Sequence, residues 1–140
     1  MLKYNAASMI SKIRDSVNKM IVSELEKNGV EGIVSSHGDI LSLLYRVDGI
    51  SVKVLAEKIH RTQPTVSVLV DKLEKLGYVE RRKSEEDSRV TLVALTKKGQ
   101  TLEPIFAKVS EELNELLYGG LTDDEKELFE SLLERVFQRF

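Results

Sequence analysis

Short polar side chains that can hydrogen-bond to nucleotide bases occur together near the middle of the chain. They are Thr62, Gln63, Thr65 and Ser67. A glutamine amide can bond adenine through two hydrogen bonds, and a hydroxyl can bond a base or a phosphate. Cationic side chains that could neutralise phosphates follow at Lys72, Arg82 and Lys83. The pattern indicates DNA contacts if the fold places these residues on one face; otherwise the three cations are ordinary solvated surface charges.

Two short helices and a turn are expected to position these side chains. Ser51 is the expected N-cap of a helix that ends near His60, and Thr62 caps the next helix, which tolerates Pro64 in its first turn and continues to Gly77. The apolar stripe of this second helix is Val66, Leu69, Val70 and Leu73. Its opposite face carries Gln63, Thr65, Val68, Lys72 and Lys75.

An antiparallel hairpin is expected directly after the second helix. Residues 78–83 and 90–96 are rich in β-branched or aromatic side chains and flank a charged loop, 84–88, which is longer than a tight two-residue turn. Two short helices followed by a hairpin form a winged helix-turn-helix, whose second helix enters the major groove of DNA. The alternative is a small α+β core whose polar helix face is solvated.

The two ends of the chain are predicted to be helical and strongly apolar on one side. The first segment has one long stripe that ends at Gly29 and Gly32, and Ser36 with Asp39 is the expected cap of the helix that follows. Thr122 and Glu125 form a capping box for a last helix. The residues expected to meet a second copy of the chain are Ile10, Ile13, Val17, Leu128, Leu132, Val136 and Phe137.

The predicted fold is therefore mainly α with a small β-hairpin wing. Residues 1–34 and 100–140 would form a helical dimerisation region, and residues 35–99 a winged helix-turn-helix domain. The net charge of −2, taken alone, argues against nucleic acid, but these three segments carry net charges of +1 (1–34), +3 (35–99) and −6 (100–140). The acidic excess lies outside the predicted DNA-binding segment.

Composition also limits the chemistry of the protein and the cellular compartment in which we expect it. With no cysteine, it has no disulfides, thiolate metal sites or thiol redox sensing. No apolar run reaches the roughly 18 residues of a membrane span, and the N-terminus lacks the core of a secretory signal. We expect a cytoplasmic protein without a membrane partner.

Two stretches resemble the multiple antibiotic resistance regulator (MarR) family. Residues 87–99, DSRVTLVALTKKG, are similar to the family's wing signature, and the stretch from residue 55 to residue 79 is similar to its helix-turn-helix. The flanking helices fit too, so the resemblance covers nearly the whole chain. It implies a homodimer with intertwined terminal helices that binds a palindromic operator on double-stranded DNA, most often as a repressor.

The resemblance also assigns roles in the wing and suggests a ligand. Arg89 would enter the minor groove, and Asp87 would hold the wing or that arginine in position; the alternative is a simple ion pair within the hairpin. Many family members carry a basic residue where this chain has Val68, which leaves apolar contact with a thymine methyl group at that position. A small aromatic or anionic effector would release the operator, and no cofactor is expected.

Three other classes of protein are weaker interpretations. A metal-responsive regulator would need more ligands than His37 and His60, which lie in different predicted elements. An enzyme is not indicated, because no P-loop, nucleophile elbow or zincin motif occurs. A winged helix that binds proteins instead of DNA is disfavoured by Arg89 and by the polar face of the second helix.

Overall fold

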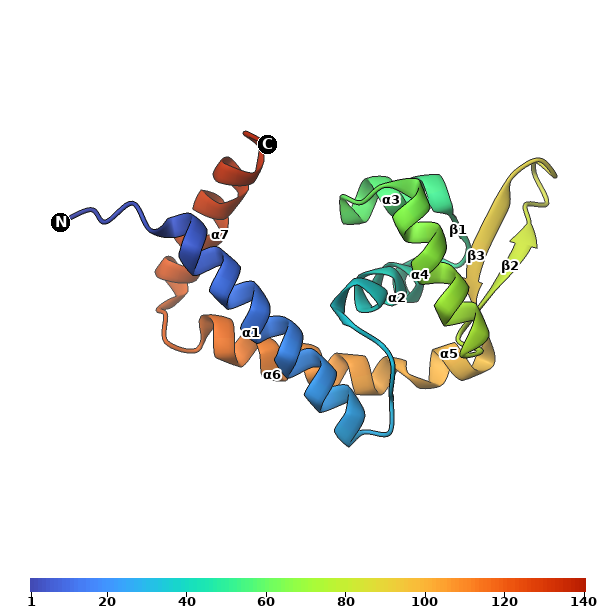
Figure 1. Ribbon diagram of the computed structural model, residues 1–140, viewed down its shortest axis with the longest axis horizontal. Coiled ribbons are helices and arrows are strands. Elements are labelled where there is room, and N and C mark those ends of the chain that lie inside the picture. Colours follow the sequence, from blue (N-terminus) through green and yellow to red (C-terminus); the bar gives the residue numbers. More distant parts are fainter. The chain divides into compact units, whose positions relative to one another are not determined.

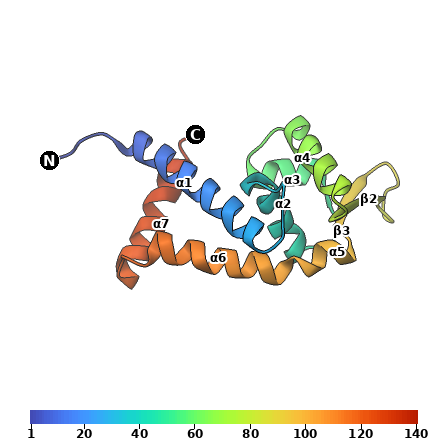
Figure 2. The same ribbon diagram turned by 60° about the horizontal axis from the view of Figure 1, so that its bottom comes forward.

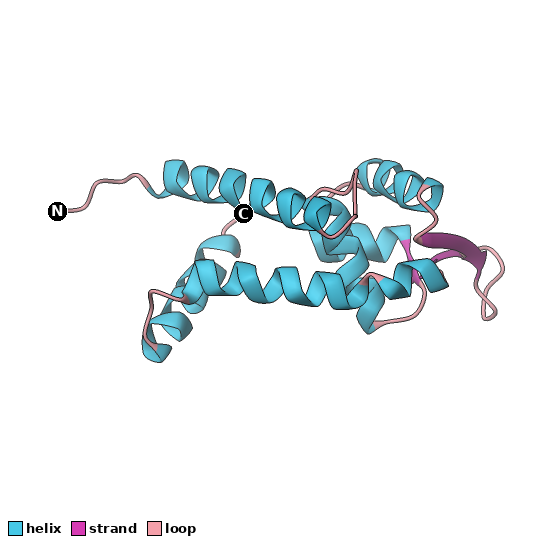
Figure 3. Cartoon of the chain, turned by 90° about the horizontal axis from the view of Figure 1, so that it is seen from below, coloured by secondary structure: helices cyan, strands magenta, loops and turns pink.

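The computed structural model describes residues 1–140, which form two units, Met1–Val109 and Ser110–Phe140. Seven helices and three short strands make up the chain (Figures 1 and 3). The elements are α1 (Ala6–Lys27), α2 (Ser35–Arg46), β1 (Ile50–Ser51), α3 (Val52–Ile59), α4 (Gln63–Lys75), β2 (Val79–Lys83), β3 (Thr91–Leu95), α5 (Lys97–Thr101), α6 (Glu103–Tyr118) and α7 (Asp123–Phe137). This is the mainly helical winged-helix fold predicted from the sequence.

The first unit has one hydrophobic core, to which most of its elements contribute. Its fully buried side chains include Leu25, Ile33, Ile40, Leu41, Leu55, Val66, Val70, Leu73, Val79 and Val93. The buried stripe of α4 is the predicted one, with Leu69 only partly buried. The apolar stripe of α1 is divided: Met20, Ile21 and Leu25 pack on the core, whereas its N-terminal part is exposed.

Helix α2 does not begin as the sequence predicted. Its N-cap is Val34, and Ser36 lies inside the first turn, where its hydroxyl accepts a hydrogen bond from Arg61 at 3.4 Å. The backbone N–H of Val34 donates to Nδ1 of His37 at 3.0 Å. A side chain at the third helical position thus satisfies the N-cap N–H, as a glutamate or glutamine does in a capping box. The Ser36 and Asp39 prediction was wrong because histidine is not a usual residue for this role.

The caps of α3 and α4 are the predicted ones. The Ser51 hydroxyl accepts from the backbone N–H of Val54 at 3.2 Å, and the Thr62 hydroxyl accepts from that of Thr65 at 3.3 Å. His60 ends α3 in the left-handed conformation, with φ of 58°. Of the three residues between the two helices, His60 therefore ends α3 and Thr62 begins α4.

The three strands form an antiparallel sheet in the order β1-β3-β2. The predicted hairpin is present, with Val79 opposite Leu95 and Lys83 opposite Thr91. Strand β1 was not predicted, because two residues are too few to show an alternating pattern; it pairs Ile50 with Val93.

The chain leaves the sheet through α5, which is tightly fitted to the core. Thr96 caps this helix by accepting from the backbone N–H of Gly99 at 3.0 Å. A Cβ at Gly99 would lie 2.0 Å from the carbonyl oxygen of Tyr78, so only glycine fits there. The Tyr45 hydroxyl donates to the Gly99 carbonyl at 3.1 Å, and this contact ties α5 to α2.

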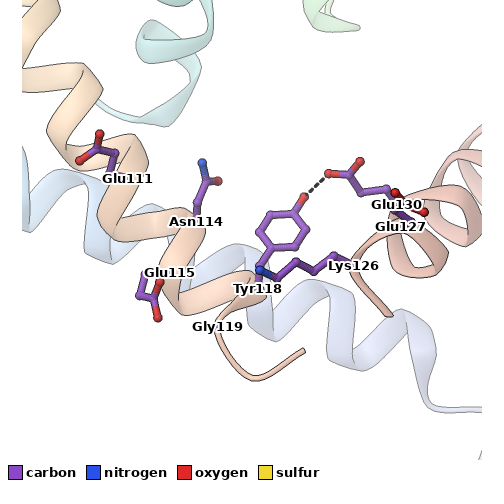
Figure 4. A pocket seen from close by; sticks show the side chains of 8 residues that line it. All are labelled: Glu111, Asn114, Glu115, Tyr118, Gly119, Lys126, Glu127 and Glu130. Atoms are coloured by element: carbon purple, nitrogen blue, oxygen red, sulfur yellow. Dashed lines mark hydrogen bonds between the residues drawn. The ribbon is translucent and has the colours of Figure 1, made fainter. Parts of the chain in front are cut away.

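The second unit contains the end of α6 and all of α7. The predicted capping box is present: the Thr122 N–H donates to the Glu125 carboxylate at 2.9 Å, and the Glu125 N–H donates to the Thr122 hydroxyl at 3.2 Å. Tyr118 fixes the turn, since its hydroxyl donates to Glu130 at 2.7 Å (Figure 4). The Tyr118 ring also meets Phe129 edge to face. No residue of α7 is buried. None of the helices in the chain has both the length and the apolar character to cross a membrane.

Candidate nucleic-acid interface

The outer face of α4 presents the side chains that the sequence singled out. Gln63, Thr65 and Val68 are exposed, and Ser67 is half-buried. The Gln63 amide makes no hydrogen bond within the chain, so its donor and acceptor are both available. Val68 has 67% of its surface exposed, an apolar group directed outward in the middle of a polar helix face.

The start of α4 is suited to meeting a phosphate or a base edge. Its first backbone N–H groups have no helical partner, and the helix dipole places positive charge at this end. The Thr62 hydroxyl bonds the backbone N–H and the hydroxyl of Thr65, while Pro64 lacks an N–H altogether. A shallow pocket between α3 and α4 is lined by Ala56, Glu57, His60, Arg61, Thr62 and Thr65. Arg61 was not among the predicted site residues, although a cation just before a helix cap is a recognisable signal.

Lys72 is exposed, but its side chain lies along the flank of α4 that faces the loop between α1 and α2. A Cβ added at Gly32 would lie 3.4 Å from Cε of Lys72. The positive charge of Lys72 also lowers the pKa of His37. Lys72 thus lies on the flank of α4 next to this loop, and its exposed side chain remains available to a phosphate.

The wing carries the Asp87 and Arg89 pair in a bidentate arrangement. Nε of Arg89 donates to Oδ1 of Asp87 at 3.0 Å, and Nη2 donates to Oδ2 at 3.1 Å. The backbone N–H of Arg89 also donates to the same carboxylate at 3.0 Å. These hydrogen bonds lower the pKa of Asp87 and raise that of Arg89. The guanidinium is nevertheless mostly exposed, so its outer N–H groups remain open to an acceptor.

Two neighbouring arginines on β2 point in opposite directions. Arg82 forms an ion pair with Asp48 at 3.1 Å, next to the turn at Gly49, so part of its charge is already neutralised. Lys83 is exposed and forms no ion pair. Arg81 lies on the other side of the strand and contacts α4.

The residues expected at a dimer interface are largely exposed, each within its own unit. Ile10 and Ile13 are exposed on α1, and Val17 is half-buried. On α7, Leu128, Leu132, Val136 and Phe137 all have at least 45% of their surface exposed. These faces are apolar without being covered by their own unit.

His37 links the stability of α2 to pH. Burial, and secondarily the charge of Lys72, lowers the pKa of His37 below its ordinary 6.5. Only the neutral ring can accept the Val34 N–H, because a protonated Nδ1 is a donor. The unfolded chain therefore binds the proton first as the pH falls, so this contribution to stability is complete above pH 6.5 and is lost as the pH falls through the folded pKa.

We expect the variant His37→Gln to lose part of this pH dependence. Glutamine at the same position can still accept the Val34 N–H but does not titrate. Urea unfolding of both proteins at pH 8 and pH 5.5 measures the effect, and the difference between the two proteins cancels the pH effects that they share. An equal loss of stability in both proteins between these pH values would contradict the assignment.

The fold and the exposed groups together define a winged helix-turn-helix DNA-binding protein. A polar helix face, an open helix N-terminus and an arginine-bearing wing lie on one compact unit (Figures 1 and 2). Comparison with known proteins agrees with this class. The sequence model of the MarR family matches residues 34–91.

Relatives and solved structures extend the match over nearly the whole chain. The uncharacterized HTH-type transcriptional regulator YdgJ of Bacillus subtilis (strain 168) is 32% identical over 120 residues, which cover 86% of this chain and 72% of YdgJ. A MarR transcriptional regulator from Methanosarcina mazei Go1 is 28% identical with a TM-score of 0.82, over 99% of this chain and 92% of that one. MepR of S. aureus, in a complex with DNA, is 25% identical with a TM-score of 0.87 over both full chains. The chain belongs to the MarR family of transcriptional regulators.

Proposed function

We propose that the protein binds a palindromic DNA operator as a homodimer, represses transcription there, and is released by a small aromatic or anionic ligand. The observation that carries the proposal is the pairing of an unobstructed α4 face with a wing that holds Arg89 outward. The match to MepR over its full length, in a structure that contains DNA, supports the same mode of binding. In this mode the major groove would be contacted by Thr62, Gln63, Thr65, Ser67 and Val68, and the minor groove would be contacted by Arg89.

The homodimer is supported by the apolar faces of α1 and α7. Removing such exposed apolar surface from water favours association, at about 25 cal/mol per Å². A two-fold axis in the protein would match a two-fold axis in the operator, with half-sites about one helical turn apart. Residues 1–34 and 100–140 would thus serve dimerisation, and residues 35–99 DNA binding.

Release by a ligand is supported by a groove within the first unit. It lies between α1 and the start of α2 and is lined by Asn18, Lys19, Val22, Ser23, Glu26, Val34, Ser35 and Ser36. Val22 and Val34 offer apolar contact, and Lys19 offers a positive charge to an anion. A ligand there would contact both α1 and α2, and it could change operator affinity by favouring one arrangement of the two helices.

Selection of bound fragments from a genomic DNA library, followed by sequencing, tests the proposed function. We expect the enriched fragments to share a palindrome. We also expect the genes next to them to be expressed more strongly in cells that lack this protein. Fragments without a shared motif would reject sequence-specific binding, and would favour a winged helix that binds proteins. Lower expression on deletion would reject repression.

Substitutions in α4 should separate base contacts from phosphate contacts. Gln63→Ala is expected to change the preference among operator variants, because the amide bonds base edges. Lys72→Ala is expected to weaken binding to all sequences nearly alike, because a phosphate contact carries no sequence information. Binding titrations against a panel of single-base operator variants measure both. Identical profiles for the two variants would contradict this division.

A further inference from the structure

Arg81 connects the wing to α4, the proposed recognition helix, through three hydrogen-bond acceptors. Nη2 of Arg81 donates to Oδ1 of Asp71 at 2.8 Å and to the Ser67 carbonyl at 3.4 Å, and Nη1 donates to Oε1 of Glu74 at 2.9 Å. Residues 67, 71 and 74 follow each other at helical spacing, so they form one flank of α4. Both views in Figures 1 and 2 show β2 beside α4.

The geometry of this contact suits a rigid connection. A guanidinium is planar and presents its N–H groups in a fixed fork, so bonds to three acceptors determine both its position and its orientation. Arg81 has 26% of its side-chain surface exposed, less than Asp71 with 60% or Glu74 with 44%. The arginine therefore lies between the helix and the strand, and it is less available to DNA than Arg82 or Arg89.

The wing needs such a connection, because it projects beyond the core. Strand β2 is buried at Val79 but exposed at Glu80, Arg82 and Lys83. Beyond Lys83 the loop is held mainly by contacts within the wing itself, as in the bond from the Ser84 N–H to the Val90 carbonyl at 2.9 Å. Arg81 is thus the point nearest the wing tip at which the hairpin is bonded to α4.

We propose that Arg81 is a positioning residue that holds the wing at a set distance and angle from the recognition helix, so that Arg89 and the α4 face reach their two grooves together. The inference rests on the proposed mode of DNA binding. Asp71 and Glu74 supply the carboxylates that accept hydrogen bonds from Arg81. Their negative charges, which would otherwise repel phosphates, serve to hold Arg81.

The proposal predicts an effect opposite in sign to simple electrostatics. Removing carboxylates from a DNA-facing helix should tighten binding if they only repel phosphates. If they hold Arg81, the double variant Asp71→Asn/Glu74→Gln should weaken operator binding by about tenfold, as should Arg81→Ala, since interactions within one network are worth roughly this much. The matched control is Glu80→Gln, on the same strand but exposed and without a bonded partner; its binding should be unchanged or slightly tighter. Tighter binding by the Asp71→Asn/Glu74→Gln variant would overturn the proposal.

A second comparison separates positioning from direct contact. In an Arg89→Ala background the wing has lost its main contact, so adding Arg81→Ala should cost less than about twofold. If Arg81 itself bound a phosphate, the two losses would multiply, and that result would also overturn the proposal. The melting temperature of each variant is measured as well, and binding is compared at a temperature where every variant is fully folded.

A distance measurement without DNA tests the connection itself. The chain has no cysteine, so spin labels can be attached at Lys75→Cys on α4 and Glu85→Cys near the wing tip, with excess unlabelled protein to isolate distances within one chain. We expect a narrow distance distribution that broadens in the Arg81→Ala background. An unchanged distribution would reject the positioning role, even if the protein binds its operator. A protein that shows the broadening but binds no DNA would instead reject the proposed function.

Discussion

Replacing Arg89 by alanine is expected to weaken operator binding by about 1–3 kcal/mol and to lower the salt dependence of binding by about one counterion. The guanidinium has 88% of its side-chain surface exposed while Asp87 holds it from one side. It is therefore oriented before it meets DNA, and little conformational entropy is lost on binding. A narrow minor groove concentrates negative potential, which increases the attraction for such a group.

The measurement is a set of binding titrations at several salt concentrations. Lys108→Ala is the matched control, because Lys108 is an exposed cation on α6, away from the wing and α4. It removes the same charge and should leave affinity nearly unchanged. If Arg89→Ala bound as tightly as the wild-type protein, Arg89 would be only a hairpin ion pair.

Leu132→Glu is expected to convert the protein to monomers and to reduce affinity for a paired half-site by about 10²–10⁴-fold. Leu132 has 45% of its surface exposed in the apolar stripe of α7, so the chain can fold with a charge there. In a dimer, two buried glutamates would lack partners, and burial of an unpaired charge is strongly unfavourable. The loss of affinity follows because the second half-site is then no longer bound within the same molecule.

Sedimentation at micromolar concentration and titration with whole and half operators measure these effects. Ser131→Glu is the control, since it adds the same charge at the next position, on the polar side of α7. Deletion of residues 122–140 should reproduce the behaviour of Leu132→Glu. A wild-type protein that is monomeric at micromolar concentration would reject the homodimer, whatever the variants do.

The local features of this fold could be predicted because they depend on a few neighbouring residues. Ser51, Thr62 and Thr122 cap their helices as expected, since each hydroxyl needs only a backbone N–H three residues ahead. The hairpin could be predicted because two segments rich in β-branched or aromatic residues flank a charged loop. Strand β1 could not be predicted, because its two residues become a strand only when β3 lies beside them.

The cap of α2 shows where local rules failed. Ser36 has the favoured residue type, but Val34 takes the N-cap position and His37 reaches back to it. A histidine ring can do this only when it is neutral, and burial keeps it so. The choice between Ser36 and Val34 was therefore decided by packing around residue 37.

The kinds of elements, the family and the set of polar side chains that could meet DNA can be recognised in the sequence, because helical spacing, caps and motifs are local. The use of each cation depends on tertiary packing. Arg81 bonds α4, Arg82 pairs with Asp48, and Arg89 is held outward by Asp87. The partners of Arg81 and Arg82 lie 7 to 34 residues away along the chain, so their roles depend on how the hairpin packs against α4 and the turn after α2.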